Sequence, residues 1–379
     1  MWKTSTGKIS CLSFLAGVLI GSSVNGQTLT PKYSNEFLNI GIGARALGMG
    51  GAQVSSVNDV TAAYWNPAGI SGIQFEHEFS LMHAEYFAGI AKFDYAGYST
   101  AIDGKNQVAL TLIRFGVDDI PDTRFLYDAN GALNYNHIQF FSAADYAMIL
   151  SYAKALSDKL KIGINTKVIH RNVGKFASAW GFGLDLGTIF QLEEWRFGLM
   201  LRDITTTFNS WSHHPDMVRD IYVRTNNPVP LNTTELTMPR ATFSVAKFIN
   251  VSDMISFQPV IDIDMTFDGK RNSLLKSNLV SIDPRMGIEM GYRKLVYLRG
   301  GVGNIQKIKS FDADYLTFRP SFGIGVFLHE TVNIDYALSD IGSISETPYS
   351  HVFSLKVGLN AHKDEFRTHN WEGNNVQKP

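Results

Sequence analysis

The sequence has little cysteine, little charge and no long apolar run. Its only cysteine, Cys11, lies within residues 1–26, so the rest of the chain has no disulfide framework and no thiolate metal site. Charged residues make up 18% of the chain, against about 25% in soluble domains. After the N-terminal segment no stretch reaches the roughly 18 apolar residues of a spanning helix, which excludes a helical membrane protein.

Residues 1–26 are predicted to be an export signal. Lys3 and Lys8 supply positive charge, Ile9–Ile20 is a short apolar stretch, and Val24–Gly26 resembles a cleavage site. We therefore expect a mature chain that begins near Gln27 and contains no cysteine. Loss of the two lysines changes the formal net charge from −1 to −3. This balance gives no positive surface for nucleic acid, so we expect no nucleic-acid partner.

Large apolar residues alternate with small or polar ones from about residue 75 to about residue 360. In the run Trp180-Gly-Phe-Gly-Leu-Asp185, for example, each large apolar residue is followed by glycine or aspartate. A period of two predicts β-strands whose faces meet different surroundings. We expect about fourteen strands, most of them long enough to cross a membrane at a tilt. They lie near residues 75–84, 87–101, 106–116, 138–154, 159–171, 179–192, 194–203, 239–250, 254–267, 284–293, 295–303, 318–328, 331–339 and 350–360.

Short and long connections alternate along the chain. The short connections are residues 102–105, 155–158, 193–194, 250–253, a position near 294, and 329–330, with one further short connection at 85–86. The long connections are residues 117–137, 172–178, 204–238, 268–283, 304–317 and 340–349. Outer-membrane barrels have short periplasmic turns and long outer loops. The fold class predicted for residues 75–360 is therefore all-β, a closed antiparallel transmembrane β-barrel.

A soluble all-β protein is the main alternative. It would place its apolar face inside and a charged face outside. Here the second face is often glycine, which suits a lumen into which another segment packs. The membrane barrel is favoured for that reason, and within lipid only a closed barrel pairs every strand's backbone groups.

Residues 27–74 carry no long alternation and are predicted to form a compact plug, or hatch, inside the barrel. The segment has too much glycine for a helix, and Pro67 fixes its own φ and extends the residue before it. Residues 361–379 form a polar C-terminal tail. The residues expected to define the plug are Gly41, Gly43, Arg45, Gly48, Gly50, Asp59, Trp65, Asn66, Pro67, Ala68 and Gly69.

Several charged residues lie on the less apolar face of the predicted strands. On the lipid side each would cost about 2–4 kcal/mol near the midplane, so we expect them to face the lumen. There they hold the plug or line a passage, and Arg45 is the expected plug partner of the acids. The predicted lumen residues are Asp185, Asp262, Asp264, Arg285, Glu289, Arg293 and Asp335.

The remaining motifs do not support a nucleotide site, a metal site or a catalytic site. Gly41–Ala46 matches the letters of a dinucleotide fingerprint but lacks the strand–helix–strand unit that the motif needs. His213–Asp216 lies in a predicted loop without a third metal ligand at a recognisable spacing. No nucleophile, base and acid form a set that supports catalysis. We therefore predict no enzyme activity, no cofactor and no metal.

The segment Phe37–Gly51, followed by Asp59–Gly69 with Tyr-Trp-Asn-Pro-Ala-Gly at its end, resembles the PorV/PorQ family. These are FadL-like outer-membrane proteins of Bacteroidota associated with the type IX secretion system. The Asn-Pro-Ala element also resembles the hatch of the FadL fatty-acid transporters. The glycine-rich part looks more like the broad branch of the family than like the dedicated PorV shuttle.

The resemblance implies an outer-membrane location, contact with lipid, and one of two activities. The first is binding of type IX secretion components or secreted cargo at the outer face. The second is a FadL-like conduit for small hydrophobic molecules. Loops 117–137 and 204–238 are the candidate partner surface. Its predicted residues are Trp211, Tyr222, Pro228 and Pro230.

Overall fold

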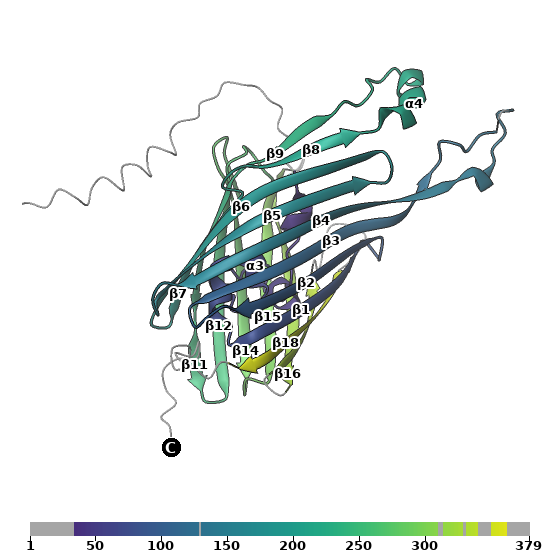
Figure 1. Cartoon of the computed structure of the whole chain (residues 1–379). Coiled ribbons are helices and arrows are strands. Elements are labelled where there is room, and N and C mark those ends of the chain that lie inside the picture. Colours follow the sequence, from purple (N-terminus) through teal and green to yellow (C-terminus); the bar gives the residue numbers. More distant parts are fainter. Residues whose placement is uncertain (1–33, 129, 310–313, 329–330, 340–349, 362–379) are drawn as a thin grey trace, which may run out of the picture. The chain divides into compact units, whose positions relative to one another are not determined.

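The strands form one antiparallel sheet that closes on itself (Figure 1). Closure occurs at β1 (Phe75–Tyr86), which pairs with both β2 (Ala91–Ala101) and β18 (Ser350–Ala361). The remaining strands are β3 (Asn106–Asp122), β4 (Gln139–Ala155), β5 (Leu160–Val173), β6 (Ala177–Leu192), β7 (Trp195–Arg202), β8 (Thr207–His213), β9 (Thr233–Thr237), β10 (Arg240–Lys247), β11 (Ile249–Ser252), β12 (Ile255–Thr266), β13 (Leu275–Lys276), β14 (Ser281–Tyr292), β15 (Val296–Lys309), β16 (Asp314–Leu328) and β17 (Val332–Ser339).

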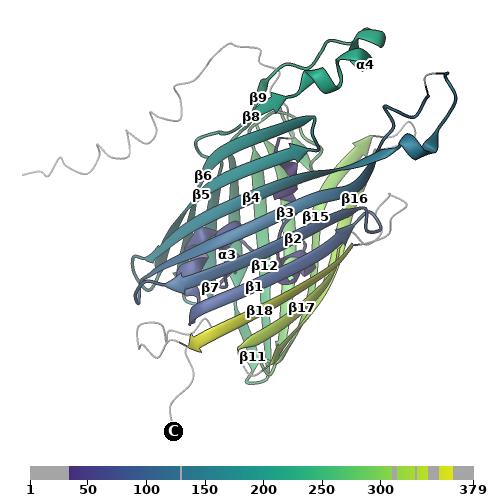
Figure 2. The same ribbon diagram turned by 45° about the vertical axis from the view of Figure 1, so that its right-hand side comes forward.

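Not every strand belongs to the closed ring. Of the eighteen described strands, β8, β11 and β13 are additions that pair at the ends of ring strands, and β9 pairs with β8. The other fourteen form the barrel, which confirms the predicted fold class and strand number. The strands are strongly inclined, as closure of a barrel requires (Figure 2).

The structure is a computed structural model that describes residues 34–128, 130–309, 314–328, 331–339 and 350–361. The predicted export signal and the tail beyond Ala361 lie outside the described residues. Within these ranges no helix is both long enough and apolar enough to cross a membrane. The helical turns are η1 (Glu36–Asn39), α2 (Ala44–Gly48), α3 (Ala62–Trp65), η2 (Pro67–Gly72), η3 (Tyr135–His137), η4 (Pro215–Met217) and α4 (Arg219–Arg224).

Several of the predicted long loops contain strand residues. β13 lies within 268–283, β15 and β16 extend into 304–317, and two further cases are larger. β3 continues to Asp122, with an irregular register between Val117 and Ile120. The region predicted as loop 204–238 contains the hairpin β8–β9, and β8 pairs with the end of β6. These predictions were wrong because a strand that extends beyond the apolar band needs no apolar outward face. The alternation that identifies the other strands is therefore weak there.

The alternation follows the two faces of the wall. In β6 the side chain of Trp180 is outward and 59% exposed, whereas Asp185 is inward and 3% exposed. The same contrast appears in β1, where Leu81 is exposed and Met82 is buried. The outward face of the described barrel is thus largely apolar, and the inward face is covered by other protein atoms.

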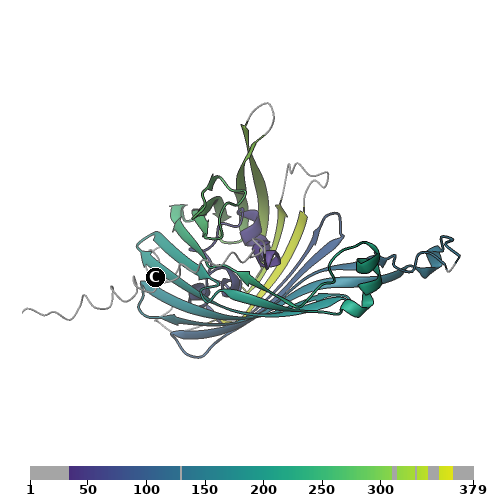
Figure 3. The ribbon, with the colours of Figure 1, turned by 90° about the horizontal axis from the view of Figure 1, so that it is seen from above.

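Residues 36–73, which we call the inner segment, lie inside the ring of strands and are visible in purple from above (Figure 3). Helix α2 packs against β15 to β18, and η2 packs against β3 to β6. Ile42, Met49 and Ile70 are fully buried. The inner segment therefore contacts two opposite parts of the wall, and these two contacts differ in chemistry.

Candidate functional site

Inward-facing glycines lie where the inner segment touches the wall. A Cβ atom built at Gly301 would lie 2.0 Å from the carbonyl carbon of Met49. One built at Gly163 would lie 2.4 Å from the carbonyl carbon of Pro67. No side chain fits at such distances, so glycine is required for the backbones to approach. These contacts explain why the second face of the strands is rich in glycine.

The glycines predicted for the plug make similar close contacts, here from the inner segment to the wall strands. A Cβ at Gly48 would lie 2.9 Å from the Cα atom of Gly323. Gly50 has a φ of +68°, and its Cβ would lie 2.7 Å from the amide nitrogen of Val302. Gly41 and Gly43 also have positive φ. The inner segment is therefore shaped by glycine to lie directly on the strands.

The Asn66–Gly69 element connects the inner segment with β6. The Asn66 side chain donates to the carbonyl oxygens of Val54 and Thr188, each at 3.0 Å, and accepts from the Ala68 amide at 3.2 Å. It thereby caps η2, whose first residue is Pro67. Trp65 donates from its indole nitrogen to another part of the inner segment, the carbonyl oxygen of Ile42 at 2.9 Å.

Arg45 lies in a buried chain of alternating charges. Its guanidinium donates to both carboxylate oxygens of Glu289 on β14, each at 2.9 Å. Glu289 also accepts from Arg299 at 2.6 Å, and Arg299 donates to Asp335 at 2.6 Å. Burial lowers the pKa of the Arg45 guanidinium, but the attraction of Glu289 outweighs burial and the pKa is raised above its usual value. Arg45 is therefore held as a cation by Glu289 of β14, which in turn is bound to Arg299 of β15.

Strands β10 and β12 hold the inner segment through its backbone. Asp262 accepts from the amides of Gln53 and Val54, at 2.9 and 3.1 Å. The hydroxyl groups of Ser244 and Ser55 lie 2.7 Å apart, and Ser244 also accepts from the Ser55 amide. A carboxylate that accepts backbone amides fixes both position and orientation.

Asp59 provides a third ionic contact. Its carboxylate accepts from the Lys356 ammonium group on β18 at 2.9 Å and also from the hydroxyl of Thr61. Burial would raise the pKa of the Asp59 carboxyl, but Lys356 and Arg45 outweigh it and hold this pKa well below its usual value. Asp59 is thus an anion that ties the inner segment to β18.

The other predicted acids pair within the wall. Asp264 lies 3.4 Å from Arg240 and 3.5 Å from Arg285. Asp185 lies 2.7 Å from Lys167. Asp185, Asp264 and Lys167 are buried on the lumen side.

Arg293 does not join them. It lies in the exposed turn after β14, with a φ of 50°. The prediction for Arg293 was wrong because β14 ends at Tyr292, and beyond a strand end the alternation no longer determines the direction of a side chain.

Sequence reasoning missed the buried cations Lys167 and Arg299 and the half-buried cation Lys356. Each lies inward within a predicted strand and next to outward apolar residues, as Arg299 does after Leu298. The same period-two argument that selected the acids would have selected them.

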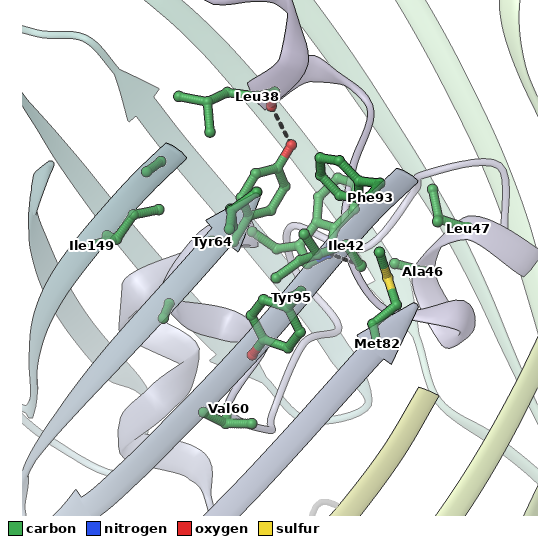
Figure 4. Packing of buried hydrophobic residues seen from close by; sticks show 14 of the residues in the cluster. Leu38, Ile42, Ala46, Leu47, Val60, Tyr64, Met82, Phe93, Tyr95 and Ile149 are labelled. Carbon is green, nitrogen blue, oxygen red and sulfur yellow. Dashed lines mark hydrogen bonds between the residues drawn. The ribbon is translucent and has the colours of Figure 1, made fainter. Parts of the chain in front are cut away.

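The inward face of β1 to β5 carries a large apolar cluster, which we call the apolar wall (Figure 4). Glu78 of β1 and Lys167 of β5 lie on the same face and are each 3% exposed. Phe93, Ile149 and Ile169 are at most 2% exposed and pack in one cluster with Ile42 and Tyr64 of the inner segment. Phe115 and Val117 extend this cluster toward the long loops and are partly exposed. Strands β10, β12 and β14 to β18, which carry the charged contacts, we call the ionic wall.

The outward face over β17, β18 and β1 to β6 carries a groove of about 960 Å³. Two rows of register-paired side chains line it. The row nearer the long loops is polar or aromatic: Phe353, His83, Asp94, Arg114, Tyr146, His170 and Trp180. The next row is apolar: Ile334, Leu355, Leu81, Ala96, Leu112, Met148 and Val168.

The predicted partner surface is only partly exposed. Trp211 is not on an outer loop, because it lies in β8 with its ring 5.1 Å from the guanidinium of Arg171 on β5. Tyr222 of α4 and Pro230 are half-buried, and Pro228 is exposed.

Comparison with known proteins shows which solved structures share this fold. No protein-family model matches the sequence, and no characterised protein matches it. The barrel is similar to the toluene transporter TbuX of Ralstonia pickettii, with a TM-score of 0.50 and 14% identity over 84% of this chain and 99% of that one. It is also similar to the monoaromatic hydrocarbon channel CymD, with a TM-score of 0.54 and 13% identity over 85% and 99% of the two chains.

A third similar structure is the toluene transporter TodX of Pseudomonas putida, with a TM-score of 0.51 and 14% identity over 85% of this chain and 99% of that one. The fold is shared. At these identities the comparison shows the architecture alone, and the chemistry has to come from the residues described above.

Proposed function

We propose that this protein is an outer-membrane conduit for small hydrophobic molecules, without enzymatic activity. The observation that carries the proposal is the apolar wall, which reaches from Phe115 and Val117 near the long loops to Ile149 and Ile169 beside the inner segment. An apolar solute that leaves water for such a surface gains free energy for each unit of area it buries.

The exposed faces support the membrane location. Outer-membrane barrels have an apolar outward band with aromatic residues at its borders. The two outward rows, one polar or aromatic and one apolar, fit the border between lipid headgroups and hydrocarbon on this side. The short turns then face the periplasm of a Gram-negative cell and the long loops face outside.

Small hydrophobic molecules are the proposed ligands because the wall along the path is apolar. The similar structures, which are described as toluene transporters and a monoaromatic hydrocarbon channel, support this ligand class. The inner segment occupies the lumen as a hatch would. A hydrophobic molecule entering near Phe115 would meet Phe37 and Leu38 of the inner segment before reaching the deeper apolar residues.

The test is uptake of toluene by cells that depend on this protein. Phe115→Asp places a carboxylate on the path, and desolvating it should slow uptake by about tenfold or more. Phe125→Asp is the matched control, because Phe125 is 51% exposed in the connection between β3 and β4. Toluene uptake no faster than in cells without the protein, or equal uptake by both variants and wild type, would reject the proposal.

Binding of type IX secretion components or cargo is a second candidate function, because large side chains protrude at the long-loop end. Tyr127, Tyr135 and Phe140 around the β3–β4 connection are 64%, 70% and 65% exposed. Exposed aromatic residues of this kind suit a protein partner. Mild affinity purification from solubilised outer membrane tests it: recovery of a secretion component or a cargo protein is expected, and recovery of neither would reject this second function.

A further inference from the structure

A group of buried polar side chains on the inward face of β2 to β5 has unmet hydrogen-bonding capacity. Ser99, Gln107 and Ser151 are 0%, 0% and 4% exposed. Among the described residues, none of their side-chain polar atoms has a hydrogen-bond partner. The same holds for the Oδ1 atom of Asn165, whose amide nitrogen donates to the Ala63 carbonyl at 2.8 Å.

Strand register brings these side chains together. Ser99 and Ser151 are both paired with Ala109 of β3, and Ser151 is paired with Asn165 of β5. Gln107 lies two residues from Ala109 on the same face, next to the turn at 102–105. We call Ser99, Gln107, Ser151 and Asn165 the polar patch. It occupies the short-turn end of the apolar wall.

The inner segment makes one hydrogen bond to this patch, from Asn165 to the Ala63 carbonyl of α3, and offers little else to bind. The element packed on β3 to β6 is η2, whose Pro67, Ala68 and Ile70 are buried and carry no side-chain donor. Its one hydroxyl group, on Ser71, donates to the Ala68 carbonyl at 2.9 Å. The contact between η2 and the polar patch is therefore an apolar surface against polar atoms.

Such a contact is unfavourable in free energy if it contains no water. Each buried polar group without a partner destabilises a folded protein, because the hydrogen bonds it made to water are lost. Buried polar groups that lack a protein partner are commonly satisfied by ordered water. The ionic wall differs, since Glu289, Asp262 and Ser244 bind the inner segment directly. Gln53, whose backbone amide binds Asp262 there, also has a buried side chain without a partner among the described residues.

We propose that the polar patch binds a file of water molecules between η2 and β2 to β5, and that this hydrated path is where the lumen opens toward the short-turn end. The opening of the lumen toward the short-turn end rests on the proposed conduit function. A water file satisfies the serine, glutamine and asparagine groups and leaves η2 without direct polar bonds to that side. Separation of η2 from the polar patch then breaks no ion pair.

Cysteine reactivity tests the hydrated path. Ser99→Cys and Ser151→Cys are compared with Ser244→Cys, which replaces a side chain that is 2% exposed but hydrogen-bonded to the inner segment. Each is made in a chain whose native Cys11 is replaced by serine, and the purified barrel is treated with a small charged methanethiosulfonate. Heat-modifiable migration confirms that each variant is folded.

Water at the polar patch gives the reagent access to the two substituted sites there. Ser99→Cys and Ser151→Cys should therefore react at least about tenfold faster than Ser244→Cys, a difference of about 1.4 kcal/mol in protection. If one of the two does not fold, the other decides. Equal protection of all three substituted sites would overturn the hydrated path.

The labelling requires no hydrocarbon, so the two proposals fail separately. Fast labelling without toluene uptake would leave the hydrated path and reject the conduit. Slow labelling with normal uptake would reject the hydrated path alone. Fast labelling of Ser151→Cys with a bulky reagent should also slow toluene uptake, because the label occupies the path; unchanged uptake would overturn the role in opening.

Discussion

The ionic wall and the apolar wall hold the same inner segment in different ways. On the ionic wall, Arg45 binds Glu289 and Asp262 accepts two backbone amides, so each contact has a defined direction and length. On the apolar wall, Ile149 and Ile169 contact the segment through apolar surface, and fewer directional bonds are present there: Glu78 accepts from the Val60 amide at 2.7 Å and Asn165 donates to the Ala63 carbonyl at 2.8 Å. Hydrophobic contact depends on buried area and not on orientation.

The difference assigns separate tasks to the two walls. Breaking a buried ion pair leaves an uncompensated charge, so the ionic wall fixes where the segment sits. An apolar surface tolerates small displacements, because a side chain that moves across it exchanges one apolar neighbour for another. A hatch that admits solutes needs one side that remains bound to the barrel wall and another side that can move relative to it.

The largest effect is expected from removing the charge of Glu289. Glu289→Gln leaves Arg45 and Arg299 buried and close to each other without their shared anion. Loss of one partner of a buried pair costs about 3–5 kcal/mol. The measurement is denaturant unfolding of the barrel in lipid vesicles. Glu85→Gln on the exposed outward face is the control, and an equally small loss in both variants would show that the ionic wall does not hold the segment.

Two adjacent glycines give the next largest effect. Gly301→Ala places a Cβ against the Met49 and Gly50 backbone, whereas Gly300 has nothing within 4 Å of a Cβ. Overpacking of this kind costs about 1–3 kcal/mol, and here backbone atoms must move. The same unfolding experiment should show the loss for Gly301→Ala and almost none for Gly300→Ala. Equal stability of the two variants would contradict close contact between the inner segment and β15.

The smallest effect is expected on the apolar wall. Ile149→Val removes one methylene group from a side chain that is 2% exposed. Such a change costs about 0.5–1.5 kcal/mol. A thermal unfolding scan in detergent measures it against wild type. A loss as large as that of Glu289→Gln would mean that the two walls hold the segment equally firmly.

Much of the fold was predictable because lipid imposes a simple rule on the strands. Trp180, Phe182 and Leu186 must be apolar outside, and their neighbours must be small or polar inside, so period two is visible in the sequence. The prediction failed where strands or side chains lie outside the region that faces lipid. β8 and β9 lie in a predicted loop, and Arg293 lies one residue beyond a strand.

The site was less predictable for a different reason. That Arg45 needs an acidic partner follows from burying a charge. That the partner is Glu289 depends on how β14 is placed around the ring, which no local pattern encodes. The polar patch has the same property, because Ser99, Ser151 and Asn165 lie far apart in sequence and meet only through the register of four strands.

The most direct test of the account is a disulfide that fixes the inner segment to the ionic wall. The hydroxyl oxygens of Ser55 and Ser244 lie 2.7 Å apart, so Ser55→Cys with Ser244→Cys in the Cys11→Ser chain can be oxidised with little movement. If the ionic wall stays bound while solute passes along the apolar wall, the oxidised and reduced forms take up toluene at the same rate. Loss of uptake on oxidation, restored by a reductant, would contradict the account.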